Sequence, residues 1–178
     1  SEVEDILRRV EKRARDSLKH LEDVLRKVDK RVRESLDNLR RVLEEVERIV
    51  RELERLLDEG TDIEELLRRM EEMIRRIEEK VRRNLDDNRR VVEEVRKEVA
   101  KDLRDNERVV KDVRREIRDE RLLEEIVRRL EDSLRKVEEI ARRIEKRLRD
   151  SLRETKRIAD EIRKRLEDAL RRVEERAR

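Results

Sequence analysis

The sequence predicts an all-α protein, a single-chain antiparallel three-helix bundle with long, straight helices. Two observations predict this fold class. First, 59% of the 178 residues are charged and 34% are apolar, with no aromatic residue, no proline and one glycine, a composition typical of long helices and poor for β-sheets. Second, apolar residues recur with the α-helical period on one face of each of three successive segments.

The helix boundaries follow from one glycine and from the direction of the apolar faces. Gly60 can adopt the positive φ of a helix C-cap, so the first helix is expected over residues 2–59. Thr61 and Glu64 form a capping-box pattern, which predicts a second helix over 62–118. At about 100° per residue, the apolar face is centred near 160° before residue 118 and near 30° after residue 121. Asp119 is the expected N-cap of a third helix over 120–177, and residues 1–178 are expected to form one domain.

Short motifs recur with a period of eighteen within each predicted helix. Ser17-Leu18 recurs as Ser35-Leu36, and Ser133-Leu134 recurs as Ser151-Leu152. Eighteen residues make five whole turns of an α-helix, so residues one repeat apart point in the same direction. A heptad repeat would impose a left-handed supercoil, whereas this repeat imposes none, and we therefore expect unsupercoiled helices.

Neutral polar residues gather at two levels of the predicted bundle. Short connections make consecutive helices antiparallel, which places residue n of the first helix near 121−n of the second and n+118 of the third. The two levels are one repeat, or about 27 Å, apart. Because buried polar groups need partners, we expect two buried hydrogen-bond networks that fix the helix register. The first layer contains Ser17, His20, Asp102, Asn106 and Ser133, and the second contains Ser35, Asn38, Asn84, Asn88, Ser151 and Thr155.

The first layer also allows three functional interpretations, which we consider weaker than a structural one. Ser17, His20 and Asp102 are the residue types of a hydrolase triad, but no sharp turn exposes the serine and no oxyanion donors accompany it. Titration of His20 could act as a pH switch, although burial and Asp102 would shift its pKa in opposite directions. One histidine with one inward carboxylate and no cysteine falls short of a zinc site. We expect no catalytic residues, no metal and no cofactor.

Charge and hydropathy argue against nucleic-acid and membrane partners. The 54 basic and 51 acidic residues alternate along every predicted helix, with no basic block and no aromatic side chain to stack on bases. No apolar run approaches the length of a membrane span, and no targeting signal is present, so we expect a soluble chain of unknown localisation. A monomer without a required partner is expected. The alternative is a homo-oligomer or a partner-binding module that uses an uncovered apolar strip on the first helix. The apolar arc of that helix has Leu18 and Leu36 at one edge and His20, Asn38 and Leu56 at the other.

The strict repeat, the absence of aromatics, the minimal connections and the two polar layers resemble computationally designed helical bundles with modular buried hydrogen-bond networks on straight helices. The resemblance covers essentially the whole chain, and the polar layers are its most specific feature. It implies a stable structural scaffold without an enzymatic site.

Overall fold

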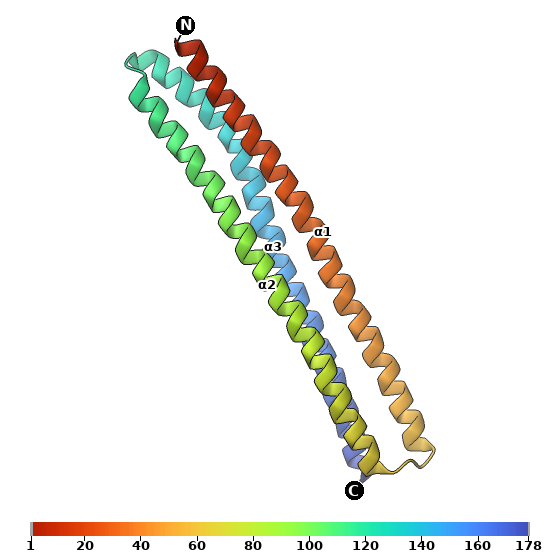
Figure 1. Ribbon diagram of the computed structural model, residues 1–178. Helices are drawn as coiled ribbons and strands as arrows, with labels where there is room; N and C mark the ends of the chain where they lie inside the picture. The colour runs from red at the N-terminus through yellow and green to blue at the C-terminus, as the bar shows by residue number, and fades with distance from the viewer. Residues whose placement is uncertain (1, 178) are drawn as a thin grey trace. The chain divides into compact units, whose positions relative to one another are not determined.

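The computed structural model describes residues 2–177, and the regular secondary structure in this range is entirely α-helical. Helix α1 spans Glu2–Asp58, α2 spans Ile63–Glu116 and α3 spans Glu120–Ala177 (Figure 1). The predicted fold class, an all-α three-helix bundle, is confirmed. The largest difference from the expected boundaries is at the end of α2, which stops at Glu116 and not at residue 118.

The connection between α1 and α2 is closed by two backbone hydrogen bonds around Gly60. The Gly60 N–H donates to the Leu57 carbonyl at 3.2 Å, and the Thr61 N–H donates to the Leu56 carbonyl at 3.1 Å. This pattern is a Schellman motif, and it requires the left-handed φ of +80° that Gly60 adopts. The predicted C-cap at Gly60 is therefore confirmed.

The predicted capping box of Thr61 and Glu64 is wrong, because Asp62 is the N-cap of α2. The Asp62 carboxylate accepts a hydrogen bond from the Glu64 N–H at 3.3 Å. Since the backbone of Thr61 completes the Schellman motif of α1, the following residue takes the capping position. At α3 the prediction holds: Asp119 accepts hydrogen bonds from two N–H groups of the first turn, at 3.1 and 3.4 Å.

Residue contacts divide the described chain into two compact units, each with a segment of all three helices. The first unit contains residues 2–30 and 91–149, and the second contains residues 31–90 and 150–177. Within each unit, the α2 segment runs antiparallel to the α1 and α3 segments (Figure 1). Residues 1 and 178 lie outside the described range, and a single domain over 1–178 stays a prediction, as does the straightness of the helices.

Each unit has an aliphatic core that follows the eighteen-residue repeat. In the first unit, Val10 of α1, Val113 of α2 and Leu130 of α3 are buried in one cluster. The second unit has two such clusters. Ile126, Ile144 and Ile162 stand one repeat apart on α3, and each is only 1–2% exposed. Residues eighteen apart on α3 therefore face the core in both units.

Ion pairs between α1 and α3 report the register of these helices. Four such pairs each join residue n to residue n+118, the offset that the sequence predicts. The pairs are Asp29–Arg147 in the first unit, and Glu47–Arg165, Glu54–Arg172 and Asp58–Arg176 in the second.

Candidate functional site

The predicted polar layers supply every buried polar side chain that the described residues contain. These side chains are Ser17, Asn88, Asn106, Ser151 and Thr155, each between 0 and 6% exposed. Burial of hydroxyl and amide groups costs free energy unless they are hydrogen-bonded. Their bonding partners therefore define the candidate site in each unit.

In the second unit, Asn88 of α2 is hydrogen-bonded to two hydroxyls of α3. Its Nδ2 donates to Ser151 Oγ and Thr155 Oγ1, both at 3.3 Å, and its Oδ1 accepts from Ser151 Oγ at 3.4 Å. Thr155 directs its own proton to the backbone carbonyls of Ser151 and Leu152, at 2.8 and 3.1 Å. The Thr155 oxygen is then free to accept from the amide, so both ends of the Asn88 side chain are satisfied.

A second polar pair in the same unit joins α1 to α2. Ser35 Oγ donates to Asn84 Oδ1 at 2.8 Å, and Asn84 Nδ2 donates to the Ser35 carbonyl at 3.4 Å. Asn38 differs from the prediction, because its side chain is exposed. It is three residues from Ser35, which at about 100° per residue rotates it about 60° away, onto the outer edge of the apolar arc. The second layer is thus two clusters, one between α1 and α2 and one between α2 and α3.

In the first unit, three side chains form a directed chain of hydrogen bonds between α1 and α2. Asn106 Nδ2 donates to Ser17 Oγ at 2.9 Å, and Ser17 Oγ donates to the Asp102 carboxylate. A carboxylate only accepts and a serine has one proton, so the Asn106 nitrogen must face Ser17. The Asn106 Oδ1 atom is buried and has no hydrogen-bond partner among the described residues.

Two members of the predicted first layer lie apart from this chain. His20 is exposed, and its Nε2 lies 3.1 Å from Glu98 Oε1 instead of joining the buried network. The reason is the same rotation that exposes Asn38, since His20 stands three residues after Ser17. Ser133 of α3 is half-buried and makes none of the hydrogen bonds described for this cluster. The first-unit network therefore does not reach α3.

The geometry does not assemble the residues of a hydrolase triad. A triad needs histidine to accept the serine proton, but Ser17 gives its proton directly to Asp102 and His20 pairs with Glu98. Within residues 2–177, no group of three or more His, Asp or Glu side chains could hold a metal ion. In the same range, none of the helices has the length and apolar character needed to cross a bilayer.

The exposed faces carry arginine–carboxylate pairs. Arg96 of α2 binds Glu145 of α3 through two N–H groups at 2.8 and 3.1 Å, and this hydrogen bonding raises the pKa of the guanidinium above its ordinary value. On α3, hydrogen bonding by Arg157 lowers the pKa of the Glu154 carboxyl. Such exposed pairs contribute little to stability individually.

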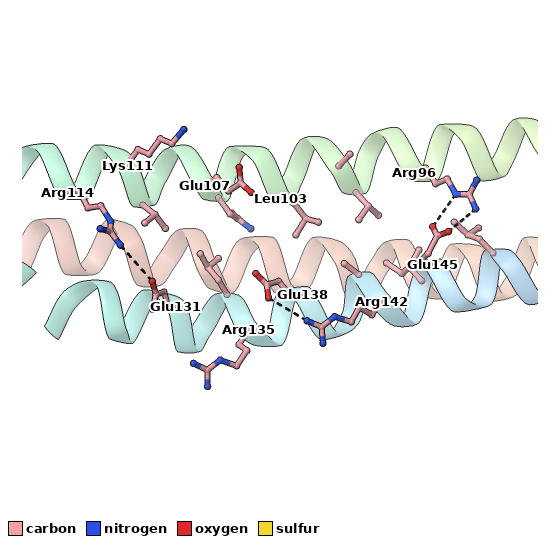
Figure 2. Close-up of a pocket in the computed structure, with 18 residues that line it drawn as sticks. Arg96, Leu103, Glu107, Lys111, Arg114, Glu131, Arg135, Glu138, Arg142 and Glu145 are labelled. Carbon is pink, nitrogen blue, oxygen red and sulfur yellow. Dashed lines mark hydrogen bonds and ion pairs between the residues drawn. The ribbon is translucent and has the colours of Figure 1, made fainter. Parts of the chain in front are cut away.

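A groove between α2 and α3 in the first unit was not predicted from the sequence (Figure 2). It has a volume of about 950 Å³ and an apolar lining that includes Leu103, Leu134 and Ile144, with Asn106 in its wall. Arg96–Glu145 and Arg114–Glu131 bridge α2 and α3 toward its two ends (Figure 2). Ala100 of α2 and Ala141 of α3 are also part of its lining.

Comparison with known proteins identifies a similar fold. No family model and no curated protein sequence matches the chain. A solved structure described as a computationally designed three-helix bundle aligns with a TM-score of 0.53 and 12% sequence identity, over 98% of this chain and 88% of the other. At this identity, the similarity concerns the fold.

Proposed function

We propose that the chain is a designed structural scaffold without catalytic activity, in which the buried polar clusters fix the register of the helices. The observation that carries this proposal is a repeated contact. Ser17 is hydrogen-bonded to Asp102, and Ser35 is hydrogen-bonded to Asn84. Ser35 is eighteen residues after Ser17, and Asn84 is eighteen residues before Asp102, as antiparallel helices with one common repeat require. The same polar contact is therefore built at both levels by one repeating rule.

Register specification follows from the cost of a mismatch. If one helix slid by a heptad, each buried hydroxyl or amide would face an aliphatic side chain and lose its partner. An unsatisfied buried polar group costs about 1–3 kcal/mol, whereas an aliphatic core tolerates many alternative contacts. The polar clusters thus penalise wrong registers more than they stabilise the correct one.

The similar fold of a computationally designed bundle supports the designed origin, together with the strict repeat and the absence of aromatic residues. The alternative, partner binding through an apolar strip on α1, has less support. Leu18, Leu36 and Leu56 are half-buried, and no large apolar side chain of residues 2–177 is exposed.

The test compares the parent with a variant in which the eight bonded polar residues become apolar. Spin labels at the exposed sites Arg51→Cys on α1 and Arg83→Cys on α2 report the α1–α2 register by electron–electron double resonance. We expect one narrow distance in the parent and a broad or split distribution in the apolar variant, which should remain folded and helical. A control with Asn38→Ala and His20→Ala should keep the narrow distance. If the distance distribution of the apolar variant were as narrow as that of the parent, the polar clusters would not specify the register.

A further inference from the structure

The α2–α3 groove of the first unit leaves apolar side chains partly uncovered that α2 buries elsewhere. Val99 and Val110 line this groove and are half-buried. Val81 and Val92 stand one repeat earlier on α2 and are only 7% and 2% exposed. Since residues eighteen apart point in the same direction, the four valines belong to one apolar face of α2, and along the groove this face lacks a covering layer.

Two antiparallel helices with an apolar groove between them form half of a four-helix bundle. A second copy of this chain, related by a twofold axis parallel to the helices, would supply the other half. Its α3 would lie beside α2 of the first copy, so that neighbouring helices of the new bundle would all be antiparallel. The side chains around the groove volume of about 950 Å³ would become the core of this bundle.

The charges along the groove match this arrangement. Arg96 of α2 and Glu145 of α3 form an ion pair at 2.8 Å, which marks two residues at the same level of the unit. Glu107 is eleven residues after Arg96, and Arg135 is ten residues before Glu145, so these two also share a level on the antiparallel helices. A twofold axis parallel to the helices preserves levels, and Glu107 of each copy would therefore meet the opposite charge of Arg135 in the other.

Lys111 and Glu131 share a level by the same count and also carry opposite charges. Among residues 2–177, neither Glu107 nor Lys111 has an ion-pair partner. Lys111 and Arg135 lie on opposite flanks of the groove, too far around their helices to meet carboxylates across it (Figure 2). These side chains are therefore placed for contacts outside the chain.

Ala100 avoids a like-charged contact in the same arrangement. Arginine stands at both positions one repeat away from it, Arg82 and Arg118. Ala100 is exposed, lines the groove and shares a level with Arg142 of α3. An arginine at position 100 would face Arg142 of the second copy, and facing like charges oppose association.

We propose that the first-unit groove is the interface of a homodimer, in which α2 and α3 of one copy pack against α3 and α2 of a second copy as a four-helix bundle. The groove runs from Glu131 to Leu148 on α3, about 26 Å at 1.5 Å per residue. Two helices about 10 Å wide present about 500 Å² over this length, and the total of about 1,000 Å² is at the lower limit of specific interfaces. The dimer is therefore reversible, with a Kd in the micromolar range.

The experiment is sedimentation velocity of the full chain, from micromolar to near-millimolar protein. We expect the mass to rise from 22.1 kDa towards twice this value as the concentration increases. Ala100→Arg should weaken the dimer by about tenfold or more while circular dichroism shows unchanged helicity. The reciprocal change one repeat earlier, Arg82→Ala in the second unit, should leave the dimer unchanged. A mass of 22.1 kDa at every concentration, or a dimer that Ala100→Arg does not weaken, would overturn the proposal.

Charge reversal separates pairing between copies from pairing within one chain. Glu107→Arg and Arg135→Glu each create like charges at both equivalent contacts of a homodimer, so each variant alone should dimerise more weakly than the parent. An equimolar mixture restores opposite charges at both contacts and should form a heterodimer. Mixing cannot restore an ion pair within one chain, so a mixture that associates no better than the separate variants would refute the arrangement.

Discussion

Truncation of Asn88 is predicted to destabilise the protein by about 2 kcal/mol, from the usual net value of a buried hydrogen bond. Asn88→Ala removes the three hydrogen bonds that this side chain shares with Ser151 and Thr155. These bonds are 3.3–3.4 Å long, so we assign each a net value of about 0.5–1 kcal/mol, near the lower end of the usual range. Thr155 keeps its backbone acceptors, but the buried Ser151 hydroxyl loses its partner on α2.

The assay is guanidinium unfolding followed by circular dichroism, with the parent and variants compared at one temperature. Asn38→Ala is the matched control, because Asn38 belongs to the same predicted layer but is exposed, and it should change the free energy of unfolding by less than about 0.5 kcal/mol. The triple variant Asn88→Leu, Ser151→Ala, Thr155→Val removes donors and acceptors together, so it should recover most or all of the loss.

Two results would refute this reasoning. If Asn88→Ala and Asn38→Ala were equally mild, the buried hydrogen bonds would contribute nothing beyond an exposed amide. If the triple variant lost as much free energy as the sum of its three single variants, the residues would not act as one satisfied network.

Three further predictions concern other parts of the fold. Ser17→Ala should cost about 1–3 kcal/mol, since it leaves Asp102 and Asn106 without their shared hydroxyl, while Ser133→Ala should stay within about 0.5 kcal/mol by the same unfolding assay. Gly60→Ala should cost about 1–2 kcal/mol, because an added Cβ meets no atom within 4 Å and the whole penalty is the φ of +80°; a neutral result would contradict the C-cap assignment. The Glu154 carboxyl, titrated by NMR, should have a lower pKa in the parent than in Arg157→Gln. Because folding lowers the pKa of Glu154, its ionised carboxylate stabilises the folded state above the pKa of the unfolded chain, and this stabilisation is lost as the pH falls through the pKa of the folded chain. Equal pKa values of Glu154 in the parent and in Arg157→Gln would argue against the pair.

Helix phase predicted the fold, and helix and connection lengths predicted the α1–α3 register. Gly60 and Asp119 cap helices at the predicted positions. Gly60 adopts a positive φ, and the Asp119 carboxylate accepts a hydrogen bond from a nearby N–H, so both caps depend on residues that are close in sequence. The α1–α3 offset of 118 was predicted from helix and connection lengths, and the role proposed for the polar clusters is to penalise the other registers. Helix and connection lengths are local quantities, so one sequence suffices.

Hydrogen-bond partners were predicted less well, because they depend on small rotations of each helix. Phase identified Ser17, His20, Ser35 and Asn38 as members of one arc, but it could not show which edge of the arc another helix covers. His20 and Asn38 were predicted to be buried but are exposed. They lie one repeat apart on the same edge of the arc, because residues eighteen apart point in the same direction. Asn106 is hydrogen-bonded to Ser17 and not to Ser133. Periodicity could not predict this partner, because it does not report interatomic distances.

The eighteen-residue period also limits how helix length can change during engineering. Since five complete turns restore every side chain to its original direction, a matched block of one full period can be added to or removed from all three helices without re-aiming a core residue such as Ile144. An insertion of one residue in a single helix would instead rotate everything beyond it by about 100° and carry buried isoleucines toward solvent. Length in this chain is therefore adjustable, but only in discrete steps.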